Sequence, residues 1–210
     1  MSAPAATRAT PRLAVLRERL PRGVAANEQL TATVATVLLV LLAVEGATLL
    51  DTRQYLSVHA FVGVLLIPVV GLKLATTSWR MLRYYLGAEE YVVRGPPPVL
   101  LRMLVAPLVV VSTIFLFGTG VALLALDQTH GQVVQLHQAS FIVWVGAMSI
   151  HVLTRLTQLP AAWRRLPGRG VRIALVGATL AAGLILAVAV LPAVDHLQDR
   201  ITEQARFDGD

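Results

Sequence analysis

The chain contains no cysteine and a single lysine, and only 14% of its 210 residues are charged. The lack of cysteine excludes disulfides, thiolate nucleophiles, iron–sulfur clusters and thiolate-ligated haem, and it leaves histidine as the strongest metal ligand available. The scarcity of charge accompanies 56% hydrophobic residues and a mean hydropathy of +0.68, values that do not suit a soluble domain. The composition therefore predicts an integral membrane protein surrounded by the lipid bilayer.

The charge that is present is strongly basic, with a net charge of +6 and a pI of about 10.7. Such a balance can indicate nucleic-acid binding, but here the arginines form short clusters between long apolar runs, as juxtamembrane residues do. We therefore exclude nucleic acid as a partner. Residues 1–28 are rich in Ala, Pro and Arg and contain no apolar run of signal-peptide length, so we expect no cleaved signal.

A membrane-spanning helix needs about 20 mostly apolar residues. Five stretches meet this requirement: Leu30–Leu50, Tyr55–Thr76, Val99–Leu126, Val133–Leu153 and Val171–Pro192. Fourteen arginines flank these stretches on one side of the membrane and three flank them on the other, in the alternation that five crossings require. Because cytoplasmic loops accumulate Arg and Lys, we expect an all-α bundle of five transmembrane helices with a cytoplasmic N-terminus and an extracytoplasmic C-terminus.

This topology divides the chain into four parts. We expect a cytoplasmic tail over 1–28, a four-helix bundle over 29–155, a basic inner loop with the fifth helix over 156–192, and an acidic extracytoplasmic tail over 193–210. Segment 77–98 combines aromatic residues with arginines and is predicted to lie at the membrane interface. The fifth helix is rich in Gly and Ala, which favours close packing on the bundle or on a partner.

Because charge is costly at membrane depth, five of the ionisable residues within these stretches are candidates for function: Glu45, His59, Lys73, His137 and His151. His59 and His137 each lie about four residues below the outer end of an inward-running helix, so we expect them at matching depth. Two neutral imidazoles from neighbouring helices can hold a b-type haem through two axial nitrogens.

Two further residues belong to this prediction. Gly63 follows His59 by one helical turn, where the absence of a side chain would admit a flat macrocycle. Glu45 lies near the expected depth of His59, and its carboxylate could accept the Nδ1 proton of an axial histidine or a proton from a quinol. The structural alternative for both histidines is a hydrogen bond to a carbonyl or hydroxyl of a neighbouring helix.

The spacing of these residues also carries information. His137 and His151 are 14 residues apart, an interval that rotates about 40° around a helix and descends about 21 Å. His59 and Lys73 are separated by the same interval. This pattern over residues 30–155 resembles the di-haem transmembrane cytochrome b families, which include cytochrome b561-like proteins and bacterial cytochrome b-type membrane subunits. In those families two histidines on each of two helices bind two haems and carry electrons across the membrane.

The chain departs from the family pattern at the fourth ligand, which is Lys73. The resemblance therefore implies one haem b near the outer face, held by His59 and His137, and leaves His151 without a histidine partner. Lys73 is expected to extend its ammonium to the inner interface or to pair with a carboxylate such as a haem propionate. A deprotonated Lys73 acting as an iron ligand is the alternative.

The function implied by this resemblance is electron transfer in a bacterial plasma membrane, as a subunit and not as a stand-alone enzyme. A quinol pool and a redox partner near the outer face, within a larger complex, are the expected partners, with a quinone as a second ligand. Two alternatives stay open from the residues alone. One is a non-haem scaffold or accessory subunit, and the other is a small proton or solute carrier that uses Glu45, His59 and Lys73.

Overall fold

The computed structural model describes residues 22–93, 99, 101–156 and 169–207. These residues form helices joined by turns, and no strand occurs among them. Five helices are long and apolar enough to cross a membrane: Gly23–Asp51, Leu56–Tyr85, Arg102–Ala125, Gln132–Thr154 and Gly170–Glu203. The all-α fold and the five spanning helices predicted from the apolar runs are thereby confirmed.

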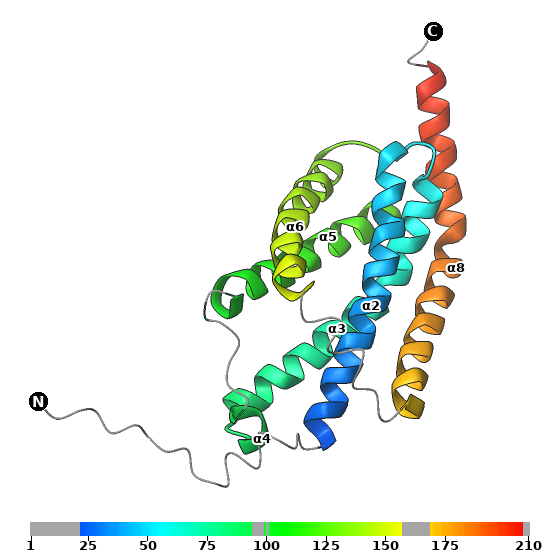
Figure 1. The fold of residues 1–210 in the computed structure, drawn as a ribbon. Coiled ribbons are helices and arrows are strands. Elements are labelled where there is room, and N and C mark those ends of the chain that lie inside the picture. Colours follow the sequence, from blue (N-terminus) through cyan, green and yellow to red (C-terminus); the bar gives the residue numbers. More distant parts are fainter. Residues whose placement is uncertain (1–21, 94–98, 100, 157–168, 208–210) are drawn as a thin grey trace, which may run out of the picture.

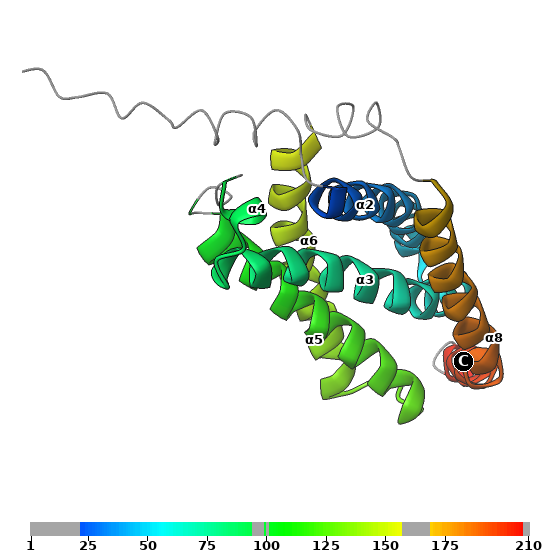
Figure 2. The same cartoon turned by 90° about the horizontal axis from the view of Figure 1, so that it is seen from below.

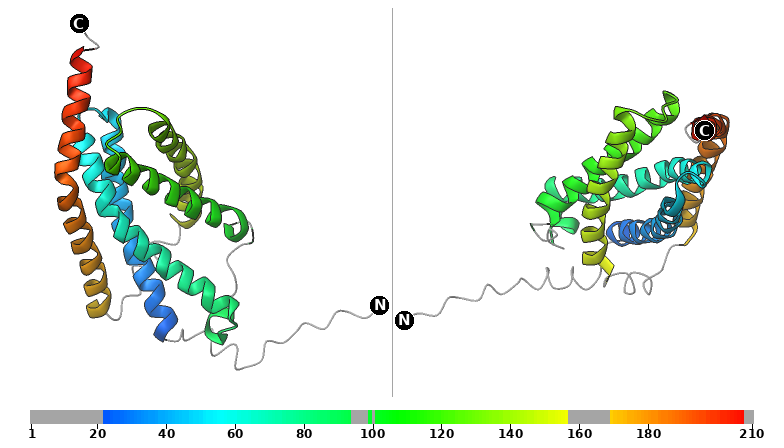
Figure 3. Two further views of the ribbon diagram at one scale, coloured as in Figure 1. Left: turned by 180° about the vertical axis from the view of Figure 1, so that it is seen from behind. Right: turned by 90° about the horizontal axis from the view of Figure 1, so that it is seen from above.

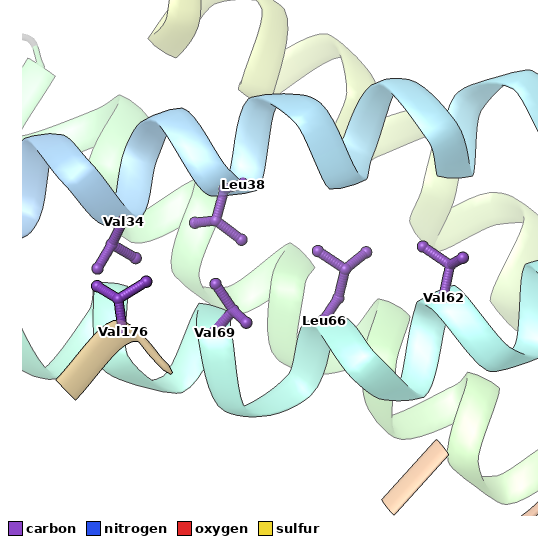
Figure 4. Close-up of a cluster of buried hydrophobic side chains, with 6 residues drawn as sticks. All are labelled: Val34, Leu38, Val62, Leu66, Val69 and Val176. Carbon is purple, nitrogen blue, oxygen red and sulfur yellow. The ribbon is translucent and has the colours of Figure 1, made fainter. Parts of the chain in front are cut away.

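The first two spans form an antiparallel hairpin of α2 (Arg22–Thr48) and α3 (Leu56–Tyr85), joined through the short 3₁₀ helix η1 (Leu49–Asp51). Their facing sides supply a core of six buried side chains, to which the last helix also contributes (Figure 4): Val34, Leu38, Val62, Leu66, Val69 and Val176. The members from α2 and α3 recur every three or four residues, which places them on one face of each helix. The core of the described chain therefore lies between α2, α3 and α8.

The second hairpin begins with the π-helical turn η2 (Leu101–Val105), continues as α5 (Ala106–Ala125) and returns as α6 (Gln132–Leu156). Pro107 lies in the first turn of α5, directly after the π-helical turn. Within the membrane Trp144 Nε1 of α6 donates to Thr113 Oγ1 of α5 at 2.9 Å. Figure 2 shows α3 lying between α2 and α5, so α3 connects the two hairpins.

The Trp144–Thr113 hydrogen bond provides a test of the second hairpin. The variant Trp144→Phe keeps an aromatic ring in the same place but removes the donor, so we expect a loss of about 1 kcal/mol in the free energy of unfolding. Reversible unfolding in mixed detergent micelles measures this loss. Ser149→Ala is the control, because Ser149 is exposed and its hydroxyl bonds only the Val145 carbonyl of its own helix; an equal loss in both variants would contradict the assignment.

The last helix, α8 (Arg169–Phe207), is longer than the sequence predicted. Pro192, the predicted end of the span, lies inside the helix, and the acidic segment after it is helical through Phe207. Figures 1 and 3 show α8 alongside the first hairpin and extending beyond it toward the C-terminus. A Cβ added to Gly183 would lie 2.5 Å from the Leu65 carbonyl oxygen of α3, so the two backbones are in direct contact there.

The extension of α8 is tied to the loops of both hairpins. Arg200 donates to the Asp127 carboxylate in the α5–α6 loop, and His196 Nδ1 lies 3.4 Å from the same carboxylate. Gln198 Nε2 donates to the Arg53 carbonyl in the α2–α3 loop at 3.0 Å. The hydrogen bond from Arg200 is the main cause that holds the pKa of the Asp127 carboxyl below its ordinary value of 3.8, with His196 acting in the same direction.

This lowered pKa predicts an acid dependence of stability. A carboxyl whose pKa is lower in the folded state stabilises the protein above its unfolded-state pKa, and that contribution is lost as the pH falls through the folded-state value. We expect Asp127→Asn to show a lower thermal midpoint near neutral pH and a smaller further loss between about pH 5 and about pH 2 than the wild type. Asn also tolerates the positive φ of 49° at this position.

Thermal scans across this pH range in detergent provide the measurement. Asp199→Asn is the matched control, since it removes the same charge from an exposed position on α8. A pH dependence of Asp127→Asn that is indistinguishable from the wild type would contradict the prediction.

The inner-loop prediction is changed in one respect. α3 runs without a break to Tyr85, so the first aromatic residues of segment 77–98 belong to the spanning helix. A turn at Gly87, with a φ of 74°, then leads into the short helix α4 (Glu89–Val92). This φ favours glycine, which commonly ends helices in this way. The predicted stiff turn at residues 95–98 lies outside the described part of the chain.

Candidate functional site

The two histidines predicted to share a depth lie side by side at the end of the bundle where the short hairpin loops are. His59 belongs to the first turns of α3, and His137 to the first turns of α6. Their ring centroids are 6.4 Å apart and the ring planes are nearly perpendicular, at 83°. The pair therefore bridges the two hairpins.

The His59 ring is oriented by two residues near the end of α2. Its Nδ1 lies 3.0 Å from Glu45 Oε1 and 3.0 Å from Thr48 Oγ1. The Thr48 hydroxyl donates its one hydrogen to the Glu45 carbonyl at 2.6 Å, so its oxygen can only accept from the ring. Thr48 is thus an acceptor, and the ionised Glu45 carboxylate is one as well, so in a neutral His59 these partners favour the proton on Nδ1 and the lone pair on Nε2.

The His137 ring is oriented in the same manner by α5. Its Nδ1 lies 3.0 Å from Thr119 Oγ1, and the Thr119 hydroxyl donates to the Phe115 and Leu116 carbonyls of its own helix. The same reasoning gives a protonated Nδ1 and a free lone pair on Nε2. In each hairpin a threonine of the first helix therefore orients a histidine of the second.

Two glycines lie close to the site. A Cβ on Gly120 of α5 would approach His137 Cε1 to 3.2 Å, so a side chain there would crowd the ring. A Cβ on Gly63 would lie 3.5 Å from Glu45 Oε1, which places Gly63 beside the carboxylate that contacts His59. The other carboxylate oxygen, Glu45 Oε2, is buried and has no hydrogen-bond partner among the described residues.

The two remaining predicted residues lie elsewhere. Lys73 follows His59 by 14 residues on α3, about 21 Å along the helix, and its Nζ donates to the Thr31 carbonyl of α2 at 3.0 Å. His151 lies the same distance along α6 from His137, half-buried, and its carbonyl accepts from Thr154. The structure thus brings His59, His137, Glu45 and Gly63 together and leaves Lys73 and His151 toward the opposite end.

Sequence reasoning missed Thr48, Thr119 and Gly120. The signal that could have identified the threonines is their position, since each is a hydroxyl near the loop end of the first helix in a hairpin whose second helix begins with a histidine. Gly120 directly follows Thr119 and gave no signal of its own.

The donor set can be tested against a haem. Two axial bonds of about 2 Å each, together with about 1 Å from each coordinating nitrogen to its ring centre, separate the ring centres by about 6 Å. The observed 6.4 Å fits this span. Within the described ranges no three His, Asp or Glu side chains gather as a metal-ion site. A haem needs only two protein ligands, because the porphyrin supplies four nitrogens.

The fold and the site together define a multi-pass helical membrane protein with an oriented histidine pair between two hairpins. No protein-family model, curated protein or solved structure matches the chain.

Proposed function

We propose that the protein is a membrane-bound b-type cytochrome that holds one haem between α3 and α6 and transfers electrons. The observation that carries the proposal is the pair of imidazoles with ring centroids 6.4 Å apart, each with its Nδ1 within hydrogen-bond distance of a threonine hydroxyl. A bound haem would supply one-electron exchange between ferrous and ferric iron. The chain's own residues hold the imidazole rings of His59 and His137 in orientation and determine how electron-rich these rings are.

The residues around the rings have separate tasks. Thr48 and Thr119 fix the tautomer and the orientation of His59 and His137, as the outer partners of metal-bound histidines commonly do. Glu45 adds a carboxylate to the His59 side, which makes that ring more electron-rich and favours the ferric state. The two histidines would therefore be inequivalent as ligands, and Glu45 is the residue expected to set the reduction potential.

The arginine distribution supports the orientation and the choice of partner. With the fourteen-arginine side facing the cytoplasm of a bacterial cell, the histidine pair lies near the outer face, and the C-terminus is extracytoplasmic. At that depth the two histidines would hold the haem within reach of a quinol or of a redox partner near the outer face. Lys73 replaces the ligand that a second haem would need, so the proposal is limited to one haem per chain.

An absorption spectrum tests the proposal directly. Full-length protein purified after expression with ample haem should show a Soret band and, after reduction, a sharp α-band, with one haem per chain by the pyridine-haemochrome assay. A protein without either band, or with two haems per chain, would contradict it. In the first case the oriented histidines are structural groups, and the non-haem accessory subunit becomes the better description.

A further inference from the structure

α3 is longer than the membrane core requires. Its 30 residues span about 45 Å, whereas the hydrocarbon core is about 30 Å thick. Asn27 of α2 donates a hydrogen bond to the Thr76 carbonyl of α3. After Thr76, the final section of α3 leans away from α2 and ends near α4 (Figure 1). Because the histidine end of α3 lies near one membrane face, this final section reaches the headgroup region of the other.

The final section of α3 holds one arginine within cation–π distance of two aromatic rings. The guanidinium carbon of Arg83 lies 5.8 Å from the Trp79 ring centroid and 6.0 Å from the Tyr91 ring centroid. Trp79 precedes Arg83 by about one helical turn, and the turn at Gly87 brings Tyr91 back from α4. We name these three residues the Arg83 cage. Cation–π contacts do not use the guanidinium N–H groups as hydrogen-bond donors, so these groups can donate to a ligand.

The neighbouring acidic residues do not neutralise this arginine. Arg80, one turn earlier, pairs with Glu28 at 3.8 Å. Glu89 and Glu90 are exposed at the start of α4, and within the described ranges neither forms an ion pair with Arg83. Arg83 therefore keeps its positive charge at a depth where the abundant anions are lipid phosphates.

The surroundings of the cage are apolar and open to lipid. Trp79 is 52% exposed, and Leu82 and Leu86 on either side of Arg83 are exposed as well. A neighbouring pair repeats the chemistry, since Arg102 lies 6.0 Å from the Tyr85 ring and its buried Nε has no hydrogen-bond partner among the described residues. An anion that also offers an acyl chain fits this combination better than a free ion.

We propose that the Arg83 cage binds the headgroup phosphate of an anionic phospholipid, with Arg83 as the principal ligand and Trp79 against the acyl chain. This proposal does not depend on haem binding and applies to the protein with or without a cofactor. One arginine near a membrane surface is worth roughly a five-fold preference for an anionic over a zwitterionic lipid.

Trp79 can report on this binding. The chain has three tryptophans, so Trp144→Phe and Trp163→Phe leave Trp79 as the only one. In this background the full-length protein in a non-ionic detergent is titrated with brominated phosphatidylglycerol or brominated phosphatidylcholine, which quench tryptophan on contact. We expect half-maximal quenching at about a five-fold lower mole fraction of the anionic lipid.

The variants decide the outcome. Arg83→Gln should abolish the preference, whereas Arg80→Gln, on the same helix but paired with Glu28, should retain it. A preference that survives Arg83→Gln, or that Arg80→Gln lowers equally, would overturn the proposal, and so would displacement of the lipid by millimolar inorganic phosphate. If Arg83→Gln does not yield folded protein, Arg83→Lys takes its place. Lysine keeps the positive charge but lacks the planar guanidinium, so full wild-type preference in this variant would overturn the role of the cage.

Discussion

Replacing either histidine of the site by alanine is expected to reduce the haem content to less than about a tenth of the wild-type value. In the proposed site, His59→Ala and His137→Ala would each remove one of the two nitrogens that hold the haem, and the other histidine could not replace it. His151→Ala is the matched control, because this residue lies 14 positions further along the same helix as His137 and should keep full haem content. The Soret absorbance per chain, measured on purified protein, provides the comparison.

Exogenous imidazole separates loss of a ligand from loss of fold. In His59→Gly the missing ring can be replaced by free imidazole, which should restore a low-spin spectrum at millimolar concentration. Equal haem loss in His151→Ala, or an intact bis-histidine spectrum in His137→Ala, would show that the site is elsewhere. Thr119→Val should have a smaller effect than either alanine variant, because it leaves the ligand in place and removes only its orienting acceptor.

Gly183→Leu is expected to cost at least about 2 kcal/mol of stability, because a Cβ at this position would lie 2.5 Å from a backbone oxygen of α3. Backbone cannot move aside as a flexible side chain does, so α8 must separate from α3 along part of its length. Unfolding in mixed micelles measures the loss. Gly177→Leu on the same helix is the control: nothing lies within 4 Å of the Cβ position there, and we expect little change. Similar losses in both variants would indicate a general effect of leucine in α8.

The spanning helices could be predicted from the sequence because the thickness of the bilayer fixes the length of an apolar run. Their ends could not, since a helix that leaves the membrane keeps its backbone hydrogen bonds while its hydropathy falls. For this reason α3 runs to Tyr85 and α8 to Phe207, well beyond the apolar stretches. Hydropathy detects the solvent around a helix and not the end of the helix.

The site could be predicted only in part for a related reason. Depth follows from topology, so His59, His137 and Glu45 could be grouped from the sequence alone. Rotation about the helix axis does not follow, because helices that are apolar on every side have no polar face to mark their orientation. The contacts of Thr48 and Thr119 depend on that rotation and on the packing between helices, and they emerge only in three dimensions.

The end of α8 has a consequence for the distance between the two histidines. His59 and His137 belong to different hairpins, and Arg200 and Gln198 of α8 fasten the loops of those same two hairpins to a single helix. α8 thus links the loop ends of the two hairpins, the ends at which the two histidines lie. Weakening these hydrogen bonds should change the distance between the two rings without altering either ring or its own hydrogen bonds, so the affinity for the proposed haem would depend partly on residues beyond the apolar part of α8.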